Sequence, residues 1–176
     1  RAESRVHSDA ICSRSLPPVS DAPTPWLYQL RLTLDPTVAP MARSGAQFAM
    51  LEPLRALLTQ HNATLVCQYD AFAGYVAEAE ARGTGGYPLY AWTRAVIEDA
   101  AKREKYVLSF TIHVAEAEVY PAAAADALEA ALQPLVGDGV ITKLARHDTN
   151  PANSPQMPAR YRPPSAAPNG GNPTDD

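Results

Sequence analysis

Residues 87–114 read YPLYAWTRAVIEDAAKREKYVLSFTIHV. Two runs rich in β-branched and aromatic residues, 87–97 and 106–114, flank a charged segment at 98–105. Such runs favour β-strands, and a short polar connection between them is typical of a hairpin. The pattern therefore predicts a long β-hairpin with a basic tip, which we interpret as a binding element.

A helix over residues 92–103 is the alternative interpretation of this segment. Ala95, Ala100, Ala101 and Lys102 are good helix formers, and they are closely spaced here. This alternative keeps a strand at the end of the segment and places a helical excursion in front of it. The sequence leaves both possibilities open.

The remaining hydrophobic pattern alternates between strand and helix periodicity. Proline after Asp35 should end the first strand, and Pro53 should mark a start or irregularity in the first helix. The expected elements are a strand at 27–34, a helix at 48–61, a strand at 64–69, strands within 87–114, a helix at 121–135 and a strand at 140–147. This order predicts an α+β ferredoxin-like plait (βαββαβ), with a four-stranded antiparallel sheet, two helices on one face and the other face free for a partner.

One domain with two tails is expected. Residues 1–25 form an extended N-terminal tail, 26–148 the ferredoxin-like domain, and 149–176 a Pro/Asn-rich extended C-terminal tail. Within the domain, 70–86 is interpreted as an insertion, a helix that ends in a glycine-rich turn. The chain does not begin with Met, which suits either organellar processing or a truncation.

Composition restricts the possible functions. The formal net charge of −4 argues against binding nucleic acid by bulk electrostatics, so any RNA contact must be local. No apolar run is long enough to cross a bilayer, and we expect no membrane partner. Cys12 and Cys67 lie in very different settings, which makes a disulfide improbable and predicts Cys67 as a core residue.

The sequence contains no clear catalytic constellation. The four histidines show no metal-ligand spacing, so we expect no metal and no cofactor. His113 on a strand could act as an acid or base in a pocket, but a lone strand histidine is more often structural. We assign no catalytic residue and expect a protein that is not an enzyme.

Three motifs resemble the small-subunit ribosomal protein six family of the bacterial type, itself a ferredoxin-like plait. YQLRLTLDP at 28–36 resembles the family's first strand, and LYAW at 89–92 is similar in position to its Leu-Ala-Tyr-Pro strand. KREKYVLSF at 102–110 is similar to the basic turn, aromatics and third strand that follow. The resemblance covers about residues 26–148 and suggests a diverged organellar, mitochondrial version in which 70–86 has no counterpart.

The resemblance implies a structural component of the small ribosomal subunit in the mitochondrial matrix, or else in a plastid or the bacterial cytoplasm. Its partners would be small-subunit rRNA, ribosomal protein eighteen and, through the tails, other ribosomal proteins. The RNA-binding candidates are Arg94, Lys102, Arg103, Lys105, Lys143 and Arg146, which would position phosphates. The partner-binding candidates are Tyr90, Trp92 and Tyr106, for which plain packing is the alternative.

A different class of function remains open. A free-standing plait dimer could hold a small ligand, or act as a small enzyme, in a pocket above its sheet that uses His113 and tyrosines. A structural subunit of another organellar complex is a further alternative.

Overall fold

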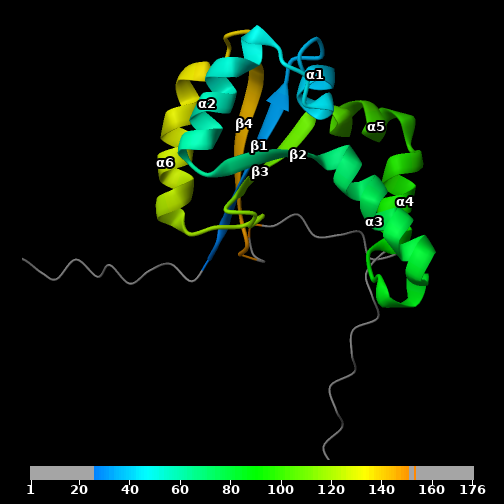
Figure 1. Ribbon diagram of the computed structural model, residues 1–176. Coiled ribbons are helices and arrows are strands. Elements are labelled where there is room, and N and C mark those ends of the chain that lie inside the picture. The colour runs from blue at the N-terminus through cyan, green and yellow to red at the C-terminus, as the bar shows by residue number, and fades with distance from the viewer. Residues whose placement is uncertain (1–25, 151–152, 154–176) are drawn as a thin grey trace, which may run out of the picture.

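A four-stranded antiparallel sheet forms the centre of the protein (Figure 1). The structure, a computed structural model, describes residues 26–150 and 153, so most of the two expected tails lies outside the described residues. The strands are β1 (Tyr28–Leu34), β2 (Ala63–Cys67), β3 (Ser109–Val114) and β4 (Ile141–Asp148). Their order is β2-β3-β1-β4, and every neighbouring pair is antiparallel. This α+β arrangement is compatible with a ferredoxin-like fold.

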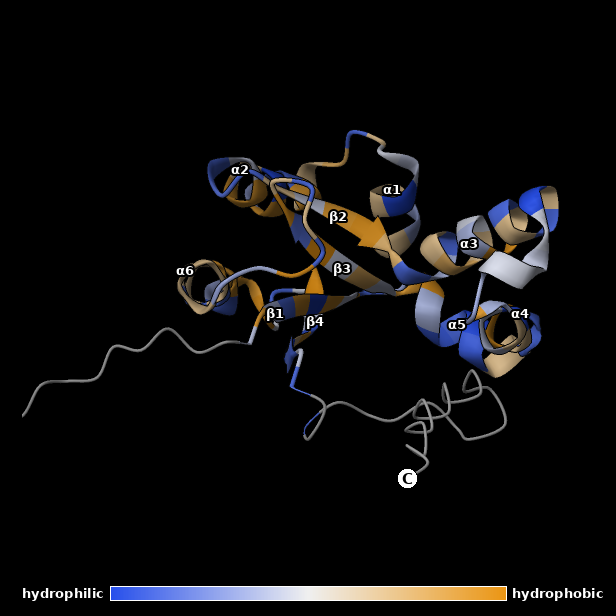
Figure 2. Cartoon of the chain, turned by 90° about the horizontal axis from the view of Figure 1, so that it is seen from below, coloured by the Kyte–Doolittle hydropathy of each residue, from blue (hydrophilic) through white to orange (hydrophobic). Residues whose placement is uncertain are grey.

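Helices lie on both sides of the sheet. They are α1 (Ala39–Ser44), α2 (Glu52–Gln60), α3 (Gln68–Arg82), α4 (Tyr90–Glu98), α5 (Ala100–Val107) and α6 (Ala122–Leu132). Short 3-10 turns occur at Ala49–Leu51, Thr84–Gly86 and Gln133–Leu135. Helices α2 and α6 pack next to each other on one side, whereas α3, α4 and α5 are gathered on the other (Figures 1 and 2).

The hydrophobic core lies between the sheet and the pair α2 and α6. Successive strand residues point to opposite faces, so Leu30, Leu32 and Leu34 of β1 all point into this core, where they are 0–1% exposed. Phe110 and Ile112 of β3 join them from the neighbouring strand. The helices contribute Leu54, Leu58, Leu128 and Leu132. Figure 2 shows apolar residues concentrated between these layers.

Most of the expected elements are confirmed, with small shifts at their ends. Pro53 lies in the first turn of α2, where its missing N–H costs no hydrogen bond. This helix ends at Gln60, and Asn62 then adopts a φ of 49°, which turns the chain into β2. Cys67 is buried, as expected for a core residue, whereas Cys12 lies outside the described residues. Helix α1 was not expected.

The predicted β-hairpin over 87–114 is wrong. Residues 90–107 form α4 and α5, and only the end of the segment, β3, is extended, which confirms the alternative of a helix over 92–103. Thr93 and Val96 are buried three positions apart, a spacing that fits one helical face and not one strand face. Asp99 then caps α5 by accepting a hydrogen bond from the Lys102 N–H at 3.1 Å.

The three helices between β2 and β3 form one packed unit, residues 68–107, which we call the helical arm. Phe72 of α3 lies at its centre. The ring of Phe72 meets those of Trp92 and Tyr106 edge-on, with centroid distances of 5.8 and 5.1 Å. The 70–86 segment lies within this arm. An ion pair of 2.6 Å between Arg43 of α1 and Asp70 of α3 ties the arm to the rest of the domain.

Tyr120 fastens one end of β1. Its backbone exchanges two hydrogen bonds with Tyr28, of 2.8 and 2.9 Å, and its hydroxyl oxygen accepts one from the buried Leu30 N–H at 2.9 Å. The side chain is 3% exposed. A tyrosine is therefore needed here for its hydroxyl as well as for its ring.

Replacing Tyr120→Phe should lower the free energy of unfolding by about 1–3 kcal/mol, because the buried Leu30 N–H loses its acceptor. Urea unfolding followed by circular dichroism measures the change. Tyr87→Phe is the matched control, since the Tyr87 hydroxyl bonds to Glu78 at the surface, and it should change little. Equal unfolding midpoints for the two variants would contradict this role.

Candidate functional site

A cleft separates the helical arm from the face of the sheet that points away from α2 and α6. It consists of two adjoining cavities of about 760 and 230 Å³. Arg31, Trp92 and Tyr106 line both of them. The larger cavity also borders Gln29, Lys105, Val119, His147, Asp148 and Thr149. The smaller one also borders Val66, Gln68, Ala71, Phe72, Thr111, His113 and Glu118. We call the two together the cleft.

The floor of the cleft is polar because of strand alternation. Gln29 and Arg31 alternate along β1 with core leucines and therefore lie on the opposite face of the sheet. In the register of the sheet, Arg31 is opposite Thr111 on one side, and Gln29 is opposite His147 on the other. Polar side chains from three strands are thus brought together below the arm.

Arg31 lies at the centre of this floor and is partly buried. Its Nε donates a hydrogen bond to the Gln29 side-chain oxygen, and the Gln29 amide donates to Glu118 at 2.7 Å. Within residues 26–150 and 153, the Nη nitrogens of Arg31 have no hydrogen-bond or ion-pair partner. Burial lowers the pKa of Arg31, and the nearby charge of Glu118 opposes that effect. The guanidinium therefore presents unused donors to the cleft.

The cleft is lined by two cations, Arg31 and Lys105, and by two carboxylates, Glu118 and Asp148, so its formal charges cancel. Both carboxylates are already hydrogen-bonded: Glu118 to Gln29, and Asp148 to the Asn150 N–H at 3.1 Å and the Asn153 amide at 3.0 Å. Lys105, in contrast, has its ammonium 5.4 Å from the centre of the Tyr106 ring, and no described carboxylate is within ion-pair distance of it. The carboxylates keep their charge but have acceptors occupied by amide donors, whereas the Nη donors of Arg31 and the ammonium of Lys105 have no carboxylate partner among the described residues.

The pKa of His147 is lowered by burial and by nearby positive charges. Burial lowers the pKa of His147, and the charges of Arg31 and Lys143 lower it further, against a smaller opposing effect of Asp148. The neutral imidazole is therefore favoured at this position. His113, which the sequence suggested as a pocket residue, lines the smaller cavity opposite Thr64 of β2.

The wall that faces the sheet is aromatic and comes from the arm. Trp92 of α4 and Tyr106 of α5 border both cavities, and Phe72 supports them from within the arm. Neither the Trp92 indole N–H nor the Tyr106 hydroxyl has a hydrogen-bond partner among the described residues. The wall therefore offers ring surface together with two polar groups.

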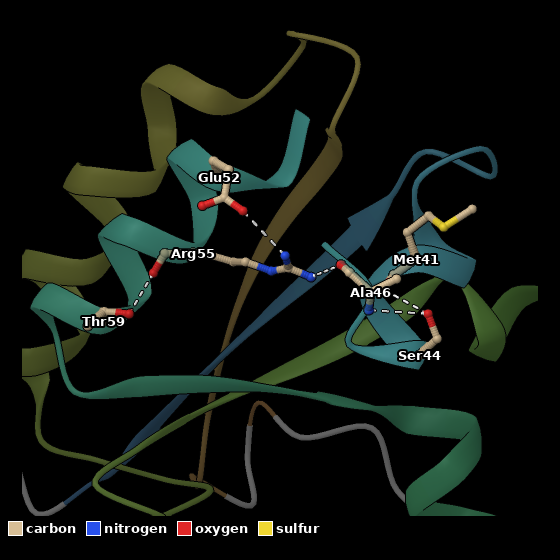
Figure 3. A network of polar contacts seen from close by, with 6 residues as sticks. All are labelled: Met41, Ser44, Ala46, Glu52, Arg55 and Thr59. Atoms are coloured by element: carbon tan, nitrogen blue, oxygen red, sulfur yellow. Dashed lines mark hydrogen bonds and ion pairs between the residues drawn. The ribbon is translucent and has the colours of Figure 1, made fainter. Parts of the chain in front are cut away.

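Another hollow, of about 370 Å³, lies between α1, α2 and β2. Its one charged side chain is Arg55, which donates to the carbonyl of Ala46 and pairs with Glu52 at 3.5 Å (Figure 3). In the same view, Thr59 donates to the Arg55 carbonyl and Ser44 to that of Met41. These polar groups serve to connect α2 with the turn after α1, so we consider the cleft the better candidate site.

The structure engages three of the six predicted RNA-binding residues in ion pairs. Arg94 contacts Glu98 at 2.9 Å and Glu80 at 3.2 Å, and Lys102 contacts Asp99 at 3.6 Å. Arg146 points to the α6 side of the sheet, where it contacts Asp126 at 2.6 Å and Glu129 at 3.1 Å. Its guanidinium also lies over the Tyr28 ring at 4.2 Å. These three side chains are bound to their own protein.

The other three predicted RNA-binding residues form no ion pair with the described residues, and their surroundings differ. Arg103 lies over the Tyr69 ring, Lys105 borders the cleft, and Lys143 is exposed on β4 opposite Thr33. Their contact with RNA stays a prediction.

The predicted partner-binding aromatics also separate. Tyr90 bonds to Glu80 at 3.0 Å and accepts a hydrogen bond from Arg94 at 2.7 Å on the outside of the arm. Trp92 and Tyr106 instead line the cleft.

Sequence reasoning missed Gln29, Arg31, Glu118 and His147 as members of one site. A signal for the first two was present, because Gln29 and Arg31 alternate with leucines in a strand pattern. Such alternation marks the face opposite the core. Glu118 and His147 reach the site only through the turn after β3 and the pairing of β4 with β1, which no local pattern reveals.

No known protein family, curated protein or solved structure matches this chain. Among the described residues, no group of three or more His, Cys, Asp or Glu side chains is placed to hold a metal ion. Nor is any helix in residues 26–150 long and apolar enough to cross a membrane. The cleft is therefore the feature from which we infer a function.

Stability should fall on mild acidification through His147. Because its pKa is lower in the folded state than in the unfolded state, the unfolded chain takes up a proton first as the pH drops below about 6.5. The loss should grow until the pH passes the folded-state pKa, and His147→Gln should make the decline shallower. Urea unfolding between pH 8 and 5 measures it.

The same pKa offers a direct check by NMR. Removing the neighbouring charge with Arg31→Gln should raise the pKa of the His147 imidazole. Titration of the ring protons in both proteins shows the change. An imidazole that titrates at or above its ordinary value in the parent protein would refute the proposed environment.

Proposed function

We propose that this chain is a binding protein, not an enzyme, that holds a small anionic ligand in the cleft of a ferredoxin-like plait. The strand order β4-β1-β3-β2 with all neighbours antiparallel, and the pairing of α2 and α6 on one face, support the plait. In this fold the second face of the sheet is left free for a partner. Here the helical arm covers that face in part and creates an enclosed site.

The observation that carries the proposal is the state of Arg31. Taking a guanidinium out of water costs free energy unless its donors find partners. The partner that it has, Gln29, is neutral and occupies only Nε. A bound anion would satisfy the Nη donors and neutralise the charge, which makes an anion the natural occupant.

The shape of the cleft supports a small molecule. Its larger cavity, of about 760 Å³, falls within the range of roughly 300–1,000 Å³ that is usual for ligand pockets. The walls combine aromatic surface with a few polar groups, as such sites commonly do. Trp92 and Tyr106 supply the surface, and Arg31, Lys105 and His147 supply the polar groups.

Inorganic pyrophosphate should bind to the parent protein at low salt, and Arg31→Gln should weaken that binding roughly 10-fold or more, as expected for the loss of charged hydrogen bonds. Isothermal titration calorimetry measures both affinities. Arg82→Gln is the matched control, because Arg82 is exposed, lies outside the cleft and forms an ion pair with Glu78 at the end of α3. Equal affinities in the parent and Arg31→Gln, or no binding to the parent, would refute the anion site.

Membership of the small ribosomal subunit is the competing proposal, with rRNA and ribosomal protein eighteen as partners in a mitochondrion or another translating compartment. The strand order favours it, as does the exposed Lys143, which has no ion-pair partner within the part of the chain that the structure describes. The hairpin that contributed to the family resemblance is absent, because 90–107 is helical. We therefore place this proposal second.

Sucrose-gradient sedimentation of a cell extract separates the two proposals. A ribosomal component should travel with small subunits and lose that association in a Lys105→Glu, Lys143→Glu double variant, which reverses the two lysines that lack a carboxylate partner. Lys102→Glu alone, at a residue paired with Asp99, is the comparison and should have the smaller effect. Recovery only at the top of the gradient would exclude the ribosomal proposal and leave the ligand-binding one standing.

A further inference from the structure

We propose that the ligand of the cleft is a nucleotide, whose phosphate is bound by Arg31 and whose base packs against Trp92. This inference rests on the proposed function, because it names the chemical class of the anion that the cleft holds. Three features of the cleft lead to it: an arginine whose Nη donors have no partner among the described residues, a supported indole ring, and polar groups in the smaller cavity.

The guanidinium of Arg31 favours a phosphate as the anion. Two Nη nitrogens of one guanidinium form a planar fork that matches two oxygens of a phosphate. Lys105 borders the same cavity from the opposite wall, so a second cation can meet the same group or a second phosphate. His147 lies in this cavity as well, close enough to Arg31 for the arginine charge to lower the His147 pKa. Asp148 borders the same cavity, but its carboxylate already accepts two hydrogen bonds, so the oxygens of a phosphate can use both cations where a single carboxylate has fewer acceptors to offer.

The indole of Trp92 favours a ligand that carries a planar ring. Trp92 borders both cavities together with Arg31, so a ligand held by the arginine lies next to the indole. Phe72 meets the Trp92 ring edge-on at 5.8 Å and 80° and supports it from inside the arm. A tryptophan that is supported on one side and borders a cavity is a stacking platform, and every nucleobase has a flat surface to place on it.

The smaller cavity provides a place for the base. Its volume of about 230 Å³ is bordered by the rings of Phe72, Trp92 and Tyr106. The same cavity contains the Gln68 amide, whose nitrogen donates to Thr111 at 3.3 Å and whose oxygen has no described donor. His113 also lines this smaller cavity and contributes its ring nitrogens. These groups can meet the polar edge of a base, whereas an aliphatic anion would leave them unused.

A nucleotide can come from two sources, a free nucleotide or one unit of an RNA strand. Both present a base and a phosphate to the same residues. The experiment below therefore includes a short oligonucleotide, which separates them without changing the proposed contacts.

The test compares AMP, ribose 5-phosphate, adenosine and inorganic pyrophosphate by calorimetry. Stacking on one aromatic ring predicts that AMP binds at least fivefold more tightly than ribose 5-phosphate. Trp92→Leu should bring AMP to within twofold of ribose 5-phosphate and leave pyrophosphate binding unchanged, whereas Arg31→Gln should weaken all three phosphates. Trp26→Leu, at an exposed tryptophan outside the cleft, should change nothing.

Three further measurements complete the test. Trp92→Phe retains a ring and should preserve most of the preference for AMP, which covers the case in which the leucine variant does not fold. In a Trp26→Phe protein Trp92 is the one remaining tryptophan, and AMP should quench its selectively excited indole fluorescence more than ribose 5-phosphate does. Tighter binding of an octameric oligoadenylate than of AMP would assign the nucleotide to an RNA strand, and equal or weaker binding would assign it to a free nucleotide.

The outcomes separate the two proposals. If pyrophosphate and ribose 5-phosphate bind through Arg31 as tightly as AMP, and Trp92→Leu changes none of them, the nucleotide inference fails while the anion site stands. If no phosphate binds to the parent protein, both proposals fail.

Discussion

The alternation of side chains along β1 is the constraint on which the rest of the structure depends. Leu30, Leu32 and Leu34 are almost completely buried against the helices, which forces the intervening residues onto the opposite face. A shift of one residue in register would exchange the two sets and bury an arginine in the apolar core. Tyr120 holds the start of this strand through its backbone and its hydroxyl. The core and the cleft thus lie on opposite faces of β1.

Stability and the proposed anion binding place opposite demands on Arg31. A guanidinium in the middle of a sheet is tolerated here because the face is polar and only partly covered by the arm. Its hydrogen bond to Gln29, and that of Gln29 to Glu118, orient the group, but no carboxylate of the described residues is in direct contact with its charge. An internal ion pair would stabilise Arg31 and would also occupy the donors that an anion needs. The arrangement is therefore suited to binding more than to maximal stability.

The helical arm converts an open sheet face into a cleft, and its conformation could not be decided from local sequence. Residues 87–97 contain Tyr, Trp, Thr, Val and Ile, which favour strands. In the structure Thr93 and Val96 are buried in the arm on one face of α4, and Trp92 contacts Phe72 of α3. A short helix in water gains little by itself, so burial against α3 determines the outcome. Propensity indicated both possibilities, and packing selected the helices.

By itself, the sequence determined the elements whose periodicity is strong: the leucine strand at β1, helices α2 and α6, the β4 strand, and the burial of Cys67. These depend on local hydrophobic spacing, which one segment carries alone. Only the tertiary structure decided that α4 and α5 are helices. It also decided that Arg94 and Arg146 form ion pairs within the protein. Finally, it brought four residues together in one cleft: Arg31, Trp92, Glu118 and His147. The physical reason is that each of these results depends on contacts between residues far apart in the chain, which no local pattern records.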